Sequence, residues 1–183
     1  MLTKQEILQL LNDTECHRVE RTISKNDMDK FCQAICAFSN DLSGDGKNGY
    51  LMIGAYDNGK LSGLKVDDGL LLKIANIRTD GNILPQPLLT IEKFTFEDGD
   101  LLVAEVQPAE FPPIRYRGRI WVRVGPRKSI ASEAEEKILT ERRLSNVRTF
   151  DAKPCLGASL QDLDIPLIKK EFLSKAVAED ILA

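Results

Sequence analysis

The feature that most constrains this chain is the stretch from 35 to 64, where an apolar helical segment gives way to turn-forming residues. Within it, the apolar run 50–54 follows a polar break and is closed by Asp57-Asn58-Gly59. An Asn-Gly pair between two apolar segments is a strong hairpin signal, because such a tight turn requires positive φ. The sequence therefore predicts a helix, a loop, a strand, a tight turn and a second strand in succession.

The flanking segments predict the remaining elements from capping boxes, helical periodicity and turn-forming pairs. Thr3 to Glu6 and Ser132 to Glu135 each have the S/T-x-x-E pattern that begins a helix. Further helices are expected after Asn26, after Val66 and after Ser159, and strands at 15–23, 88–96, 101–106 and in a hairpin over 114–124 turning at Arg117-Gly118. Because strands outnumber parallel crossovers, an α+β fold is predicted, with a mixed, mostly antiparallel sheet and flanking helices.

A break near residue 148 is expected to divide the chain into a core domain, 1–148, and a C-terminal helical extension, 149–183. The segment around Pro154 is irregular, and the last residues, 176–183, contain neither a terminating glycine nor a polar tail. The extension is therefore expected to be the start of a further region of a longer protein.

Composition narrows the class of protein. The 183 residues are 43% hydrophobic and 29% charged, as in ordinary soluble globular proteins. No apolar run reaches the roughly 20 residues that span a bilayer, and the N-terminus lacks the layout of a signal peptide, so a cytoplasmic protein without a membrane partner is expected. The net charge of -3 argues against a globally basic coat but leaves a local basic patch open. The four cysteines are scattered and His17 is the only histidine, so buried free thiols are expected rather than zinc.

A local basic patch lies in a segment of the chain that contains no Asp or Glu. Its cations are Arg115, Arg117, Arg119, Arg123, Arg127 and Lys128. Strand alternation would place Arg119, Trp121 and Arg123 on one face and the apolar residues between them on the other. Cations interleaved with an aromatic ring suit a phosphate backbone and stacked bases. A solvated strand face with Arg–Trp cation–π pairs is the alternative explanation.

Three carboxylates form a second candidate site. Glu15 and Glu20 flank the first expected strand, and Asp57 lies at the central turn. Carboxylates that converge near a basic groove could hold Mg²⁺ or Mn²⁺ for phosphodiester hydrolysis. The odd separation of the two glutamates places them on opposite faces of an ideal strand, so they converge only at a bulge or a turn. Asp57 is equally explained as the turn residue before Asn-Gly.

The segment from Gly54 to Lys60 matches the G-x4-G-K part of a phosphate-binding loop. However, Leu61 stands where that motif requires Ser or Thr, and the motif requires a strand that feeds a helix. Here the chain is predicted to turn back into a strand. No cofactor is therefore expected, and Mg²⁺ or Mn²⁺ would be needed only by a nuclease.

An ordered set of short motifs resembles a known family. The set consists of Glu15-x4-Glu20, Ala37-Phe38-Ser39-Asn40, Gly49-Tyr50-Leu51-Met52-Ile53-Gly54, Asp57-x-Gly59, Gly63-Leu64, Ile83-Leu84-Pro85, Pro112-Pro113, Trp121-Val122-Arg123-Val124-Gly125 and Ala131-Ser132. Together these motifs resemble the Schlafen AlbA-like domain, and the resemblance covers roughly residues 10–145.

The resemblance implies a DNA-binding domain of the kind found in bacterial transcriptional regulators, where the chain continues into further domains. The family is also labelled divergent AAA or ATP-binding. In animal Schlafen proteins, two glutamates and an aspartate cut tRNA and rRNA with a divalent metal. The matching positions in this chain are Glu15, Glu20 and Asp57.

We therefore expect a nucleic-acid-binding module of a bacterial transcriptional regulator, with DNA favoured over RNA as its partner. The expected contact set is Arg115, Arg117, Arg119, Trp121, Arg123, Arg127 and Lys128. A metal-dependent endoribonuclease is the alternative. A third class is a protein-interaction or homodimerisation module in which an exposed Trp121 anchors a partner chain.

Overall fold

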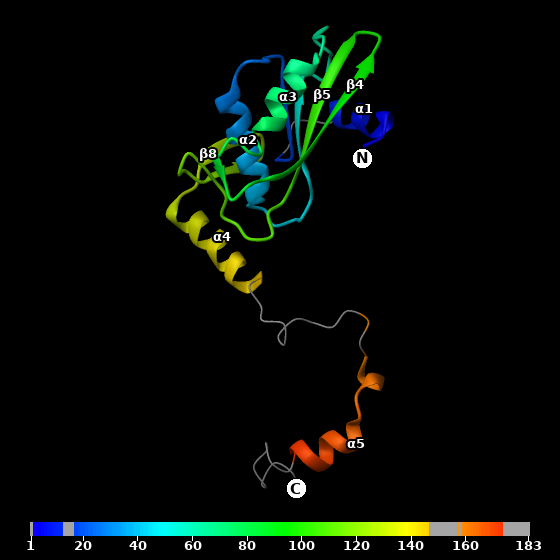
Figure 1. The fold of residues 1–183 in the computed structure, drawn as a ribbon, viewed down its shortest axis with the longest axis vertical. Coiled ribbons are helices and arrows are strands. Elements are labelled where there is room, and N and C mark those ends of the chain that lie inside the picture. Colours follow the sequence, from blue (N-terminus) through cyan, green and yellow to red (C-terminus); the bar gives the residue numbers. More distant parts are fainter. Residues whose placement is uncertain (1, 13–16, 147–156, 158, 174–183) are drawn as a thin grey trace. The chain divides into compact units, whose positions relative to one another are not determined.

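The computed structural model describes residues 2–12, 17–146, 157 and 159–173 (Figure 1). It divides into two compact units, Met1–Val147 and Arg148–Ala183. The main sheet, the helices around it and every predicted site residue that is described belong to the first unit, while Glu15 lies outside the described residues.

The first unit is built on a four-stranded sheet in the order β1-β2-β5-β4. Its strands are β1 (Val19–Thr22), β2 (Gly49–Ile53), β4 (Leu88–Phe96) and β5 (Gly99–Gln107). The β1–β2 pair is parallel, whereas β2–β5 and β4–β5 are antiparallel. Two small antiparallel sheets join β3 (Ile83–Leu84) to β6 (Arg115–Tyr116) and β7 (Trp121–Val124) to β8 (Arg127–Ile130). The predicted α+β fold with a mixed, mostly antiparallel sheet is confirmed.

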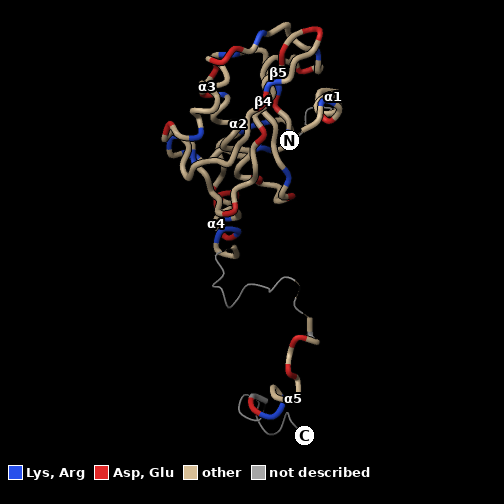
Figure 2. The backbone as a smooth tube through the Cα atoms, turned by 45° about the vertical axis from the view of Figure 1, so that its right-hand side comes forward, with Lys and Arg blue, Asp and Glu red and all other residues tan. Residues whose placement is uncertain are grey.

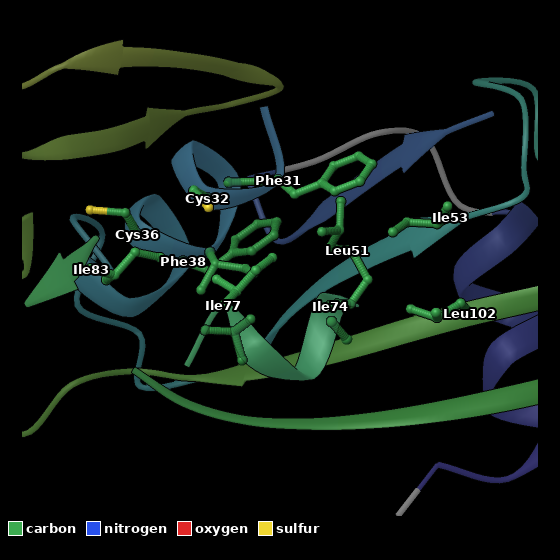
Figure 3. Close-up of a cluster of buried hydrophobic side chains, with 14 of the residues drawn as sticks. Phe31, Cys32, Cys36, Phe38, Leu51, Ile53, Ile74, Ile77, Ile83 and Leu102 are labelled. Carbon is green, nitrogen blue, oxygen red and sulfur yellow. The ribbon is translucent and has the colours of Figure 1, made fainter. Parts of the chain in front are cut away.

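Helices cover both faces of the main sheet. α2 (Met28–Asn40) and α3 (Asp68–Asn76) pack on one face, and α1 (Lys4–Asn12) packs on the other (Figure 1). Figure 3 shows Phe31 and Phe38 of α2 among Leu51, Ile53 and Leu102 of the sheet. Leu51, Ile53 and Leu102 alternate along β2 and β5 with residues that face α1, as the two-residue period of a strand requires. The helix α4 (Glu133–Asn146) buries Leu139 in a smaller cluster with Ile120 and Val122.

The predicted helix starts are confirmed by their caps. The Glu6 carboxylate accepts hydrogen bonds from the N–H and the hydroxyl of Thr3, and Glu135 does the same for Ser132. Asp27 accepts from the Lys30 N–H at the start of α2. Each of these bonds satisfies a polar group that the first turn of a helix leaves without a partner.

The predicted central hairpin is only partly correct. After β2 the chain does turn at 56–60, but the predicted second strand is reduced to a single bridge between Ala55 and Leu61. β2 already has β1 and β5 as partners, so no edge is left for a longer hairpin. Gly59 is required at this turn because its φ is +81° and an added Cβ would lie 2.0 Å from the Leu11 carbonyl oxygen. The next helix after Gly54–Lys60 is α3, which begins at Asp68. The segment therefore does not lead directly into a helix, as a phosphate-binding loop must.

The predicted hairpin over 114–124 is also corrected. The turn at Arg117-Gly118 closes a single bridge between Tyr116 and Arg119. β6 pairs with β3 instead, and β7 pairs with β8 across Gly125 and Pro126. Arg127 and Lys128 therefore lie on a strand that sequence periodicity did not predict.

The described part of the second unit is helical and short. It contains a 3-10 turn at Leu160–Asp162, α5 (Ile165–Ile168) and a π-helical segment at Lys169–Leu173. Ser159 donates to Asp162 as a cap, and Asp164 caps α5. Among the helices described in either unit, none is both long and apolar enough to cross a membrane.

Asp100, at the start of β5, gives the first unit a dependence on pH. Its carboxylate lies 2.9 Å from the Lys93 Nζ and accepts a 3.0 Å hydrogen bond from the Val66 N–H. The bond from Lys93, reinforced by that from Val66, lowers the pKa of Asp100 to about 2.

A carboxyl group with a lowered pKa stabilises the fold above its unfolded-state pKa of about 3.9, and this contribution is lost as the pH falls toward the folded-state value. Asp100→Asn should therefore be less stable than the wild type at neutral pH, with the difference shrinking below about pH 4. Urea titrations at a series of pH values measure this, with Asp98→Asn at the adjacent exposed turn as the control. A difference between Asp100→Asn and the wild type that is independent of pH would contradict it.

Candidate nucleic-acid interface

The arginine-rich segment 115–128 packs along α2 through β6, β7 and β8. Four of its guanidinium groups belong to exposed residues, which are Arg115, Arg117, Arg119 and Arg127. Figure 2 shows that basic and acidic residues are interspersed over the first unit. The segment lies within 111–132, which is the longest run of the described sequence without an Asp or a Glu.

The other two cations of the segment are buried against one carboxylate, Glu20. An Arg123 Nη1 donates to Glu20 Oε2, and the Lys128 Nζ donates to Glu20 Oε1 at 2.7 Å. The second guanidinium nitrogen of Arg123 donates to the Val19 carbonyl at 2.9 Å, and the guanidinium lies 5.4 Å from the centroid of the Phe38 ring. These contacts join β1 to the β7–β8 hairpin.

The electrostatics of this cluster follow from burial and pairing. Burial on its own would raise the pKa of Glu20, but the hydrogen bonds from Arg123 and Lys128 outweigh it, and the pKa falls below its usual value. Burial lowers the pKa of Lys128, and its bond to Glu20 offsets part of that effect. A carboxylate that binds two cations in a partly desolvated site stays ionised.

Trp121 and Arg123 do share one face of β7, which is turned toward the main core, whereas Val122 packs in the smaller cluster on the other face. What is wrong is the expectation that Arg123 contacts a ligand. It is buried while Val124 is 61% exposed, because the buried carboxylate of Glu20 offers Arg123 a partner inside the protein. Trp121 is half-buried, and its ring packs against the main core cluster. It does not stand beside Arg119 as a freely exposed ring.

Asn40, at the C-terminal end of α2, fixes both ends of the β6–β7 region. Its amide group accepts from the Ile114 N–H at 2.7 Å and donates to the carbonyls of Ile114 and Trp121 at 2.9 and 2.8 Å. The residue is 1% exposed. Asn40 ends the motif Ala37-Phe38-Ser39-Asn40, which resembles the family, but the sequence assigned it no role of its own. An amide at the end of an otherwise apolar helix was the available signal.

Arg142 of α4 secures the same end of α2. Its guanidinium donates to the carbonyls of Asp41 at 2.5 Å and Leu42 at 3.2 Å. A cation at the C-terminus of a helix satisfies carbonyls that have no helical partner and opposes the negative end of the helix dipole. α4 therefore supports the element against which the arginine-rich segment packs.

The predicted acidic site is not assembled from the residues described. Both oxygens of Glu20 are bound by cations, whereas Asp57 is exposed at the turn and its backbone carbonyl accepts from Arg21 at 3.3 Å. Glu15 lies outside the described residues. Within the described ranges, no three Asp, Glu, His or Cys side chains are grouped as a metal site requires. The described residues therefore do not form a site for Mg²⁺ or Mn²⁺, and no hydrolytic step is assigned to them.

The two cysteines of α2 are buried free thiols, as predicted. Burial raises the pKa of Cys32 to about 12 and that of Cys36 to about 11. Thiols in this state are poor nucleophiles and poor metal ligands. Cys16 and Cys155 lie outside the described residues.

The motifs that resemble a known family lie in and around α2 and the strands beside it. They include Asn40 and Glu20, whose contacts are described above. The sequence profile described as Schlafen, AlbA_2 matches residues 13–132, well over half of the 183-residue chain. The chain belongs to the Schlafen AlbA_2 family. Asn40, Glu20 and the arginine-rich segment all lie within this AlbA_2 domain. No curated protein matches the sequence.

Several solved structures resemble the chain, and two of them are described here. The DIP2311 protein from Corynebacterium diphtheriae has a TM-score of 0.51 and 17% sequence identity, over 97% of this chain and 40% of that protein. The chain thus spans less than half the length of that protein, and the likeness concerns the fold alone. The N-terminal domain of a RecG-related protein from Nitrosomonas europaea has a TM-score of 0.43 and 22% identity, over 60% of this chain and 75% of that domain.

Proposed function

We propose that the AlbA_2 domain of this chain binds nucleic acid, DNA in preference to RNA, as a module of a bacterial transcriptional regulator. The observation that carries the proposal is the set of exposed guanidinium groups of Arg115, Arg117, Arg119 and Arg127, which we call the exposed arginine set. Membership of the AlbA_2 family supports it. Arg123, Lys128 and Trp121, which were expected to contact the ligand, instead support this surface from within.

The exposed arginine set is presented on a rigid base. The Glu20 carboxylate binds Arg123 of β7 and Lys128 of β8. The Asn40 amide binds the backbone carbonyls of Ile114 and Trp121, on either side of the Arg117 turn. A phosphate ligand therefore meets guanidinium groups whose backbone is already ordered, which lowers the entropy lost on binding.

The Arg117 turn and strand β8 both contact the N-terminal end of α2. Arg117 lies 3.1 Å from Asp29, and Lys128 donates to the Lys30 carbonyl at 3.4 Å. The partial positive charge of a helix N-terminus adds to the field of the cations there, whereas Asp29 reduces it. Contacts to a charged backbone release counterions, so binding should weaken steeply as salt is added.

The test is a double variant, Arg119→Ala/Arg127→Ala, with Lys73→Ala/Arg78→Ala on and after α3 as a control of equal charge change at exposed positions. Fluorescence anisotropy with duplex DNA at several salt concentrations should show the affinity of the first variant reduced about tenfold at low salt, with a salt slope smaller by about 2. The control should stay close to the wild type. Equal losses in both variants would reject a localised interface.

A further inference from the structure

The exposed arginine set borders a pocket that the nucleic-acid proposal does not use. The pocket has a volume of about 490 Å³ and lies between the β3–β6 ladder and the turn that follows it. It is lined by the apolar residues Leu84 and Pro85, by the cations Arg115 and Arg117, and by Gly81, Asn82 and Gly118. A volume of this size is within the range of sites for small ligands.

The two kinds of wall are held next to each other by strand pairing. Leu84 and Arg115 are opposite residues of the antiparallel β3–β6 pair, so their side chains leave the ladder on the same face. Leu84 is 56% exposed although it is apolar. A guanidinium group and an exposed leucine therefore lie side by side in the lining of the pocket.

Arg117 is oriented by its neighbours. Its guanidinium lies 5.1 Å from the centroid of the Tyr116 ring and forms an ion pair with Asp29 at 3.1 Å. The Tyr116 hydroxyl donates to the same carboxylate oxygen at 2.5 Å. The side chain is nonetheless 60% exposed, so a planar face with free donors remains available to a ligand.

An apolar wall beside two guanidinium groups matches the chemistry of one unpaired nucleotide. A base has two flat apolar faces that pack on Leu and Pro side chains or stack on a guanidinium plane, while its phosphate binds the same cations. A paired base within a duplex cannot offer its face, because neighbouring base pairs cover it. The two lining glycines, at positions 81 and 118, add no side chain to the pocket.

From this arrangement we infer that the pocket formed by Leu84, Pro85, Arg115 and Arg117 binds an unpaired base, so that the domain prefers single-stranded over duplex DNA. The inference rests on the proposed nucleic-acid function and specifies its ligand. The exposed arginine set supplies the contacts to phosphate that both forms of DNA share, and the pocket supplies the discrimination.

The experiment compares three proteins on two ligands. Wild type, Leu84→Ser and Leu72→Ser are titrated with a single-stranded oligonucleotide and with its duplex, the single strand carrying 2-aminopurine as a reporter of base environment. Leu72 is an exposed leucine on α3, 63% exposed, and is the matched control. Neither serine changes the charge of the protein.

Wild type and Leu72→Ser should bind the single strand about five- to tenfold more tightly than the duplex and should change the 2-aminopurine fluorescence. Leu84→Ser should lose most of the preference and the fluorescence change, while its duplex affinity stays unchanged. Equal affinity of the wild type for both ligands, or equal effects of the two serine variants, would overturn the inference and leave the proposed function standing. Absence of binding to either ligand would reject both.

Discussion

Glu20→Ala should lower the free energy of unfolding by about 3–5 kcal/mol, because it leaves two buried cations without their counter-charge. Arg123 has a side chain that is 2% exposed and Lys128 one that is 11% exposed, so water cannot replace the lost carboxylate.

The lowered pKa of Glu20 gives the sign of the pH effect. The stabilisation is present above the unfolded-state pKa of about 4.3 and is lost as the pH falls through the lower folded-state value. Urea unfolding at neutral and acidic pH measures both.

The matched control is Glu92→Ala, on an exposed position of β4, which should change the stability by less than about 1 kcal/mol. A double-mutant cycle between Glu20→Ala and Lys128→Met isolates the pair, because the second change should cost much less once the carboxylate is gone. Additive losses in the cycle would show that the two groups do not stabilise each other.

The same variant bears on the nuclease alternative. Glu20→Ala would be expected to abolish hydrolysis if Glu20 were a metal ligand, but it should also loosen β7 and β8 beneath the exposed arginine set. Activity measurements on this variant therefore need its unfolding curve alongside. Lost activity at unchanged stability would favour a catalytic role, whereas loss of both follows from the ion-pair cluster.

Asn40→Ala should destabilise the domain by about 3 kcal/mol or more, because it leaves one buried N–H and two buried carbonyls without hydrogen-bond partners. Each such group costs about 1–3 kcal/mol. The Ile114 carbonyl keeps one weak donor, the Cys36 Sγ at 3.3 Å, so the full sum is not expected. Thermal and urea unfolding give the value.

Asn12→Ala is the matched control. Asn12 also ends a helix and donates to a backbone carbonyl, that of Leu8 at 2.9 Å, but it is exposed, so water can replace the lost bond and the change should stay below about 1 kcal/mol. Asn40→Asp separates the two halves of the amide, because it keeps the acceptor for the Ile114 N–H and removes both donors. If Asn40→Asp is as stable as the wild type, the donated bonds contribute nothing to the fold.

Much of the fold could be predicted because its signals are local. The capping boxes at Thr3 and Ser132, the apolar face of α2 and the α+β class follow from interactions within a few residues, or from a periodicity that can be counted along the chain. The same local reasoning failed where pairing was decided at a distance. The strand predicted after Gly59 does not form, because β2 already pairs with two other strands. Strand β8 was not predicted, because its register depends on β7.

The arginine-rich segment shows the same division within the candidate interface. The sequence by itself determined that cations gather between 115 and 128 and that the chain has the ordered motifs of an AlbA_2 domain. Only the tertiary structure decided which cations face the solvent. Arg123 turns inward to a glutamate 103 residues earlier in the chain, and Arg115 stands beside Leu84 through strand pairing. A side chain takes the direction in which its charge finds a partner at the lowest cost of desolvation, and that partner is set by the fold rather than by the neighbouring residues.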